Sequence, residues 1–447
     1  MIKRKIDIDV DFSKKCGKVK PMCALVGGPV FDYPFPINFT CEYRELSTPM
    51  VRVAPTSDGG RAYLELSRIF PDFSLDESFE LSYDFSRADR AVLAAVECGA
   101  GVFLSIGEGD DLREPVCRVL PKERYEKWAR VAGKIISHYN EGFASGYKLG
   151  IKYVELMPGA DRSPIFSDVG DFCEFYRIAA NYLKKRFPRI KIGAYSSGGF
   201  RSLNHVDTGR TEEGYVSYLD DFLVYVGKKN THAPLDFLSW RCLAETPEEL
   251  SLHTNYARSY LNHLGHKRAE SIISEFNIYG AGDKLPVTDK YYPSLLASSL
   301  ITAMKSDVAM MFYKDTHPYS PSNFLYTVDD RTDIRYYAAY HVMRAFGELS
   351  SGKSTVVATG EDYRHELYSL ATVNESCAHI MLVTRNYDGA IELNLSGSDY
   401  TSYSIEGILG GGERGAGFSS RAEGIAASSK IALRVGRHEV YLLTLTK

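Results

Sequence analysis

The sequence lacks the patterns that would place it at once among metal-binding, disulfide-rich or membrane proteins. It has no Cys-x-x-Cys pair and no Cys/His pair at zinc-ligand spacing, so neither a structural zinc nor a dense disulfide framework is indicated. No window reaches the roughly 18 consecutive apolar residues of a membrane helix. The basic start Met1–Asp7 has no apolar stretch behind it, so no signal peptide is indicated. We therefore expect a reduced, cytoplasmic protein, with a removed signal peptide as the alternative. The eight cysteines are Cys16, Cys23, Cys41, Cys98, Cys117, Cys173, Cys242 and Cys377.

Other common classes also find no support. The net charge of −4 is close to balanced, which argues against nucleic acid or an acidic membrane surface as the main partner. No G-x-S-x-G motif accompanies the scattered histidines, so a Ser-His-Asp hydrolase is not indicated. The glycine-rich stretch Gly410–Gly417 lacks the strand before it and the helix after it that a phosphate loop needs. We expect no cofactor and no metal.

The most unusual feature of the composition is its aromatic content, with 31 Tyr and 22 Phe. A tyrosine ring offers an apolar face and a hydroxyl together, which suits sugar rings. A tyrosine-rich core is the simpler alternative, and composition alone does not separate the two.

The middle of the chain alternates short β-branched runs with longer amphipathic stretches, a pattern typical of βα units around a parallel sheet. The eight predicted strands are 23–28, 50–55, 101–106, 152–157, 190–195, 235–241, 271–276 and 308–313. The predicted helices are 87–99, 121–138, 168–187, 212–229, 246–264 and 290–305. Asp168 and Thr246 are the expected N-caps, with Pro247 in the first helical position. These patterns predict an α/β fold, a (β/α)₈ TIM barrel, over residues 16–353.

After a predicted helix at Asp333–Leu349 the pattern changes to strands separated by Gly- and Ser-rich turns. The predicted strands are 366–371, 379–386, 390–395, 400–407, 431–433 and 439–445. They indicate an accessory antiparallel β-sandwich domain, formed by residues 354–447 together with 1–15. Lys5–Asp11 alternates apolar and charged residues, and we expect it to be an edge strand of that sandwich.

The chemistry of such a barrel lies at the carboxyl ends of its strands, so polar residues there are the candidates. Glu275 ends the seventh predicted strand and would point into the barrel mouth, where it is either an ionised nucleophile or a solvated loop carboxylate. A retaining glycosidase needs a second carboxyl about 5 Å away. Glu155, inside the fourth strand, and Asp161, beyond a Pro-Gly turn, are the two candidates. Glu155 has a strong alternative, which is a buried ion pair with a cation such as Arg52.

We assign further mouth residues to substrate binding. Trp240 either stacks on a sugar face or packs in the core. The predicted substrate-binding residues are Arg52, Glu155, Trp240, Arg241, Asn277, Tyr279, Tyr313 and Lys314.

Several segments resemble family-39 glycoside hydrolases, the group of β-xylosidases and α-L-iduronidases. Ser274–Asn277 resembles the family's nucleophile motif, a threonine-glutamate-aromatic-asparagine run, which implies that Glu275 is the nucleophile. The family's small β-sandwich, completed by its N-terminal strand, also fits the two ends of this chain. The other segments that carry the resemblance are 9–14, 26–28, 50–53, 125–129, 175–180, 183–188, 191–193 and 234–240.

The departures from the family pattern fall in the expected site. Where the family has tryptophan-asparagine-glutamate-proline, this chain has Met157–Ala160, so Pro158 replaces the asparagine and Gly159 replaces the acid/base glutamate. Ala54 and Arg241 stand where the family has histidines. Loss of a positioned general acid typically costs about 10²–10⁴-fold in rate.

Three functions follow from this combination. The first is a retaining glycoside hydrolase for β-xyloside-like or related linkages of oligosaccharides, in which Glu275 attacks and Asp161 is the candidate acid. The second is a glycan-binding pseudoenzyme without turnover. The third is a glycosyl transferase or phosphorylase that uses the same covalent intermediate. In each case the expected partner is a small carbohydrate, and homo-oligomerisation stays open. Arg241 and Lys314 would suit a negatively charged sugar or phosphate.

Overall fold

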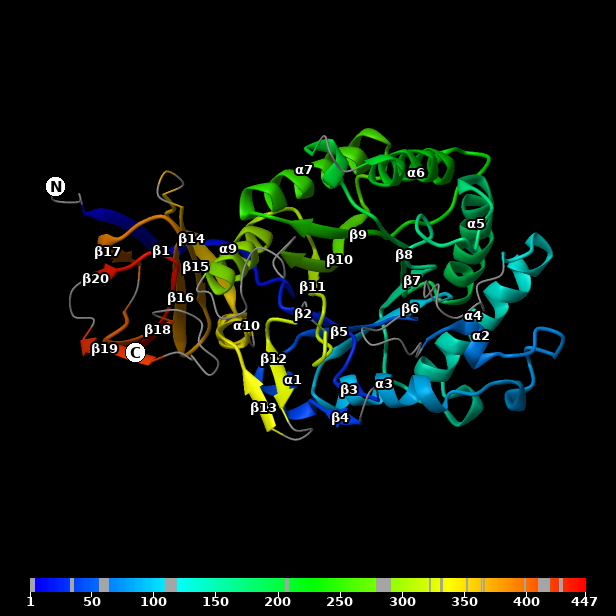
Figure 1. Ribbon diagram of the computed structural model, residues 1–447, viewed down its shortest axis with the longest axis horizontal. Helices are drawn as coiled ribbons and strands as arrows, with labels where there is room; N and C mark the ends of the chain where they lie inside the picture. The colour runs from blue at the N-terminus through cyan, green and yellow to red at the C-terminus, as the bar shows by residue number, and fades with distance from the viewer. Residues whose placement is uncertain are drawn as a thin grey trace.

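The structure, a computed structural model, shows a closed barrel beside a separate β-sheet domain (Figure 1). The predicted fold class is confirmed. Both chain ends lie at the β-sheet domain, on the left in Figure 1. The described residues are 5–32, 36–55, 64–108, 119–205, 209–278, 291–320, 323–329, 333–350, 353–362, 364, 366–397, 399–408, 419–425 and 429–447.

Eight parallel strands close the barrel in the order β10-β11-β2-β5-β6-β7-β8-β9. Each predicted barrel strand has its counterpart. The barrel strands are β2 (Ala24–Val26), β5 (Met50–Val53), β6 (Gly101–Ile106), β7 (Tyr153–Leu156), β8 (Lys191–Ser197), β9 (Phe237–Ala244), β10 (Glu270–Ile278) and β11 (Met310–Tyr313). Side chains such as Phe103, Phe237 and Phe312 fill the interior, so the barrel is a packed core.

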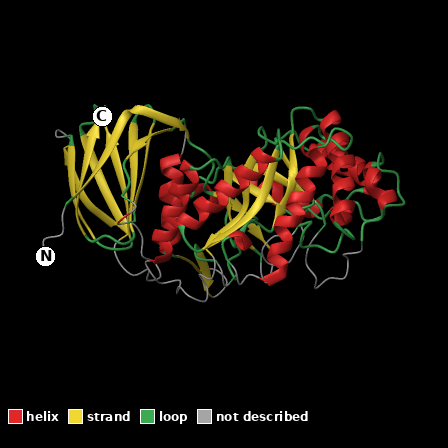
Figure 2. Ribbon diagram, turned by 90° about the horizontal axis from the view of Figure 1, so that it is seen from above, coloured by secondary structure: helices red, strands yellow, loops and turns green. Residues whose placement is uncertain are grey.

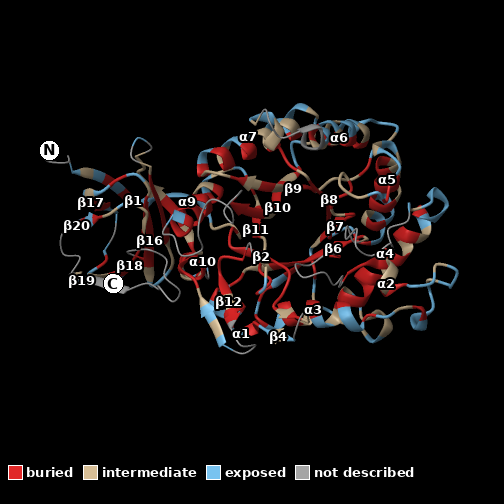
Figure 3. Ribbon diagram, in the orientation of Figure 1, coloured by how far each residue is buried: buried red, intermediate tan, exposed pale blue. Residues whose placement is uncertain are grey.

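Helices surround the barrel, with their apolar faces against the strands (Figure 3). Asp168 and Thr246 accept hydrogen bonds from the backbone N–H groups of Asp171 and Glu249, which confirms both predicted N-caps. The helices are α1 (Thr40–Glu45), α2 (Leu66–Ile69), α3 (Ser86–Glu97), α4 (Tyr125–Asn140), α5 (Val169–Arg186), α6 (Gly209–Gly227), α7 (Pro247–His263), α9 (Tyr291–Lys305) and α10 (Ala338–Ser350). The 3₁₀ helices are η1 (Glu80–Ser82), η2 (Lys122–Arg124), η3 (Phe143–Ser145) and η4 (Arg201–Leu203). No helix within the described ranges combines the length and the apolar character needed to cross a bilayer.

The predicted helix at Asp333–Leu349 is wrong in its first turn. Residues Asp333–Tyr336 form β13, which pairs antiparallel with β12 (Tyr326–Asp329), and α10 begins only at Ala338. Exposed and partly buried residues alternate along β13, so this segment has the period of a strand. A second short ribbon joins β3 (Val30–Phe31) to β4 (Ile37–Asn38).

Among its described residues, the accessory domain contains nine strands in the order β19-β18-β21-β16-β15-β14-β1-β17-β20, and of these neighbours only the β1–β17 pair is parallel. Strands from both ends of this order share one apolar core, so the sheet curls until its two halves face each other as a sandwich (Figure 2). The strands are β1 (Ile6–Lys18), β14 (Thr355–Thr359), β15 (Leu367–Val373), β16 (Cys377–Thr384), β17 (Gly389–Ser396), β18 (Ser402–Ile408), β19 (Ser419–Ile425), β20 (Lys430–Val435) and β21 (Glu439–Thr446).

The N-terminal strand is not the edge strand that the sequence predicted. β1 lies between β14 and β17, inside the sheet, and continues to Lys18. Ile8, Val10 and Phe12 are buried, as the alternation required. That alternation fixes which face is buried, but it is the same for an edge strand and an inner strand.

The outer face of the sandwich packs against the barrel. Leu370 and Met381 belong to the same apolar cluster as the barrel helices, and α9 and α10 both contact β15 and β16. These two helices are accordingly buried on both sides (Figure 3).

Candidate active site

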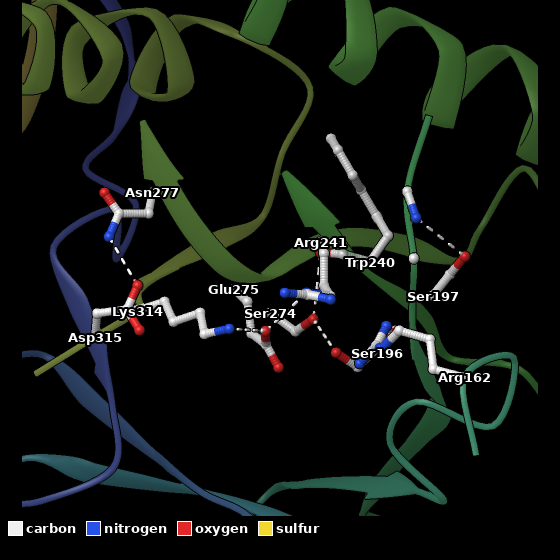
Figure 4. A network of polar contacts seen from close by, with 12 residues as sticks. Arg162, Ser196, Ser197, Trp240, Arg241, Ser274, Glu275, Asn277, Lys314 and Asp315 are labelled. Atoms are coloured by element: carbon white, nitrogen blue, oxygen red, sulfur yellow. Dashed lines mark hydrogen bonds and ion pairs between the residues drawn. The ribbon is translucent and has the colours of Figure 1, made fainter. Parts of the chain in front are cut away.

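The carboxyl ends of the barrel strands bring together the partly exposed carboxylate of Glu275 and four cations, three of which, Arg162, Arg241 and Lys314, are labelled in Figure 4. Glu275 lies on β10, Arg241 on β9 and Arg52 on β5, while Lys314 directly follows β11. Arg162 comes from the loop after β7 and had not been singled out in the sequence.

Glu275 is held from several sides. Its Oε2 lies 2.8 Å from Arg241 Nε and 3.4 Å from Lys314 Nζ, and its Oε1 lies 3.6 Å from Arg52 Nη1. Burial by itself would raise the pKa of Glu275, but the nearby charges of Lys314, Arg241, Arg162 and Arg52 outweigh it and hold the pKa well below its usual value. The carboxyl is therefore ionised, and its side chain keeps 15% of its surface exposed.

Beneath Glu275 lies a buried ion pair. Arg52 Nε and Nη2 donate to Glu155 Oε2 at 3.1 and 2.6 Å, and the Ser105 hydroxyl donates to the same oxygen. Both charged side chains are almost fully buried. We call Arg52, Ser105 and Glu155 the floor of the mouth. Glu155 thus forms the buried ion pair with Arg52 that the sequence analysis gave as the alternative to a catalytic role. It has no exposed surface for direct contact with a substrate.

Asp161 is anchored to β8. Its Oδ2 accepts hydrogen bonds from the Gly198 N–H at 2.7 Å and the Ser197 hydroxyl at 3.2 Å, and its Oδ1 lies 3.6 Å from Arg162 Nη1. The side chain is only 1% exposed. Burial raises the pKa of Asp161 despite the neighbouring Arg162. The direction of this shift suits a proton donor, whereas the burial limits contact with a substrate.

Residue 159, where the family-39 resemblance implied an acid/base glutamate, has a cation as its neighbour. Gly159 has a φ of +75°, and a Cβ placed on it would lie 2.9 Å from Arg162 Nη2. Arg162 Nη1 in turn donates to the Ser196 carbonyl at 2.8 Å. The guanidinium of Arg162 therefore lies directly against the place where a side chain at residue 159 would begin.

Three further predicted substrate-binding residues are buried, as Arg52 and Glu155 are. Trp240 packs edge-on against Phe200, and its Nε1 donates to Ser271 Oγ, so its ring has no face free for a sugar. Tyr313 and Asn277 are also buried. Tyr279 lies outside the described residues.

A hydrogen-bond network supports the site from behind. Asn277 Nδ2 donates to Asp315 Oδ2 at 3.0 Å, and its Oδ1 accepts from the Tyr292 hydroxyl, which also bonds to the Tyr313 hydroxyl. Burial raises the pKa of Asp315. Asn277 and Tyr313 thus support the end of the barrel through this network.

Two serines lie under Glu275, of which Ser274 belongs to the motif that carries the family resemblance and Ser196 had been given no role. The hydroxyls of Ser196 and Ser274 lie 2.9 Å apart and join β8 to β10 (Figure 4). Ser196 and Ser274 share one detectable signal, since each lies in a barrel strand, whereas Arg162 lies in the loop after β7. Within the described ranges, no group of His, Cys, Asp and Glu side chains is arranged to hold a metal ion.

The fold is shared with solved glycoside hydrolases. A glucosidase from Croceicoccus marinus is similar over the whole of both chains, with a TM-score of 0.76 and 17% identity. The GH39 enzyme from Xanthomonas axonopodis pv. citri has a TM-score of 0.69 at 13% identity, over 100% of this chain and 98% of that one. An α-L-arabinofuranosidase from Thermotoga maritima has a TM-score of 0.69 at 10% identity, over 99% of this chain and 100% of that one. Comparison with protein-family models finds no match, and comparison with curated sequences finds none. At these identities the likeness shows the fold alone.

Proposed function

We propose that this chain is a retaining glycoside hydrolase in which Glu275 forms the covalent bond to the sugar. The observation that carries the proposal is the setting of Glu275, an ionised and partly exposed carboxylate at the carboxyl end of the seventh barrel strand. Chemistry in this fold occurs at that end of the barrel. The glycoside hydrolases among the structural neighbours and the Ser274–Asn277 motif give the proposal further support.

This mechanism also needs a group that protonates the leaving group. Gly159 has no side chain that could donate a proton. Either Asp161 is the donor, or the substrate has a leaving group that departs without protonation. The raised pKa of Asp161 supports the first option, although the side chain must move to reach a sugar. On the basis of the sequence resemblance, we also propose that the chain is a family-39 member and that its substrates are β-xyloside-like.

A glycan-binding protein without turnover is the second candidate. Arg162 beside Gly159 favours it, because a cation lies next to the residue at which the acid/base glutamate is expected. The cations around Glu275 also reduce its basicity and therefore its strength as a nucleophile.

Covalent labelling separates the two candidates. An activated fluorinated glycoside, located by peptide mass spectrometry, is expected to mark Glu275. Glu275→Gln should abolish the label. Glu270→Gln should retain it, because Glu270 lies at the opposite end of the same strand and pairs with Lys191. A panel of aryl glycosides with good leaving groups should also be hydrolysed. If no member of the panel labels Glu275 or is hydrolysed, while sugars still raise the melting temperature, glycan binding replaces the proposal.

A Gly159→Glu variant tests the position of the missing acid. Hydrolysis of substrates with poor leaving groups should increase, whereas activated substrates should change little, because only the former need protonation. The new side chain must displace Arg162, so the double variant Gly159→Glu/Arg162→Ala provides the space. If neither variant increases hydrolysis of poor leaving groups, the acid belongs at another position.

A further inference from the structure

The exposed part of the mouth is cationic. Arg162, Arg241 and Lys314, which we call the rim, have side chains that are 14%, 20% and 24% exposed. All three lower the pKa of Glu275, so they act on one centre. Arg52 differs, because it is 2% exposed and bonds twice to Glu155.

One carboxylate serves most of the rim. Arg241 and Lys314 both pair with Oε2 of Glu275. Of the two other acids nearby, Asp161 has a side chain that is only 1% exposed and Asp315 is half-buried, and burial raises the pKa of each. A second anion above Glu275 would therefore meet three cations, of which Arg241 and Lys314 share the charge of Glu275 and Arg162 lies 3.6 Å from Asp161 Oδ1.

The position of Arg162 shows which side of the mouth attracts anions. In a retaining hydrolase, the acid/base carboxylate repels an incoming anion during the second step. At residue 159 that carboxylate is missing, and the Arg162 guanidinium lies 2.9 Å from where a Cβ would be. The repulsive group is thus replaced by an attractive one.

We propose that Arg162, Arg241 and Lys314 form a binding site for an oxyanion, a phosphate, sulfate or carboxylate group, beside Glu275. Planar guanidinium groups match the geometry of such groups, and charge-assisted hydrogen bonds are the stronger class. The oxyanion comes either from the sugar itself or from a free inorganic anion.

With a free oxyanion as the acceptor, the second step would need no acid/base residue. An oxygen of the anion forms a bond to the anomeric carbon while the bond from that carbon to Glu275 breaks, and the electron pair returns to the carboxylate. An oxyanion needs no general base, whereas water does. This catalytic consequence rests on the proposed function, but binding of the anion does not.

Binding is tested first, on the whole chain without a sugar. Calorimetric titration with inorganic phosphate and sulfate, at constant ionic strength set with chloride, should show saturable binding. Arg162→Gln should weaken it about tenfold or more, the usual loss for one charge-assisted hydrogen bond. Arg268→Gln, which removes an exposed arginine ahead of β10, should leave it unchanged.

Glucuronate and glucose then separate the two sources. If the sugar carries the anion, glucuronate binds about tenfold or more tightly than glucose, and Arg162→Gln removes the difference. If the anion is free, phosphate added to an aryl glycoside yields a glycosyl phosphate of retained configuration. Anion binding without any turnover supports the site and contradicts the proposed hydrolase. The site itself is overturned if phosphate, sulfate and glucuronate all bind no better than chloride and glucose, or if Arg162→Gln and Arg268→Gln behave alike.

Discussion

The floor and the rim of the barrel mouth contain the same kinds of side chain and use them differently. In the floor, Arg52 and Glu155 are buried, hydrogen bonded to each other and closed to solvent. In the rim, Arg162, Arg241 and Lys314 keep part of their surface and share the charge of Glu275. A buried pair is costly to break because the remaining charge has no water. In a partly exposed pair, water or a bound ligand can replace one of the two partners. A binding site needs cations that can change partners in this way.

The largest effect should come from breaking the floor. Arg52→Met leaves Glu155 as a buried, uncompensated carboxylate, and we expect a loss of about 3–5 kcal/mol in the free energy of unfolding. Arg241→Met makes the same change in the rim and should cost about 1 kcal/mol or less, because water can replace the lost partner. Chemical denaturation measures both. Equal losses would contradict the distinction between floor and rim.

Glu275→Gln should have the next largest effect. The variant removes the carboxylate shared by three cations, and we expect it to destabilise the fold at neutral pH by about 1–3 kcal/mol. The folded-state pKa of Glu275 is lowered, so its contribution is fully present above the unfolded value of about 4.3. This contribution is lost as the pH falls toward the folded value. The stability difference between the natural protein and the variant should therefore shrink on acidification, and a constant difference would argue against an ionised Glu275.

Gly159→Ala tests the contact between residue 159 and Arg162. At a φ of +75°, with Arg162 Nη2 only 2.9 Å from the new Cβ, the substitution should cost about 1 kcal/mol. Gly214→Ala is the matched control, since Gly214 lies in α6 and a Cβ added there would have nothing within 4 Å. There alanine should be neutral or stabilise the helix by up to about 1 kcal/mol. Thermal unfolding of the two variants checks the prediction, and a loss of the same size at both sites would contradict it.

The smallest effect should be that of Lys314→Gln. The ammonium lies 3.4 Å from Glu275 and is partly exposed, so the loss should stay within about 1 kcal/mol. It should also decrease with added salt, because mobile ions screen exposed charges. Unfolding at low and high ionic strength measures this. A large loss that does not depend on salt would place Lys314 in the floor.

Much of the barrel could be predicted because its elements have clear periods and end signals. All eight strands and the caps Asp168 and Thr246 follow from local sequence alone. The position of β1 inside the sandwich could not be predicted, because pairing between strands leaves no mark on either strand separately.

The candidate site was predicted less completely, for two reasons. The register shift of β10 against β9 between Ile273 and Glu275 sets which side chains face the mouth, and such bulges are not visible in a single sequence. Trp240 and Arg241 are neighbours on a strand, so they point to opposite sides, and only Arg241 reaches Glu275. Arg162 escaped notice because loop residues have no period to place them.

The position of β1 also has a consequence for the order in which the protein is made. Its partners β14 and β17 begin only at Thr355 and Gly389, so on the ribosome β1 emerges hundreds of residues before they do. Domains generally fold as units during synthesis, from the N-terminal side. The sandwich is an exception here, because its first strand must stay unpaired while the whole barrel is made. Ile8, Val10 and Phe12 are exposed during that time, which makes residues 6–12 a place where chaperones would be expected to bind the nascent chain.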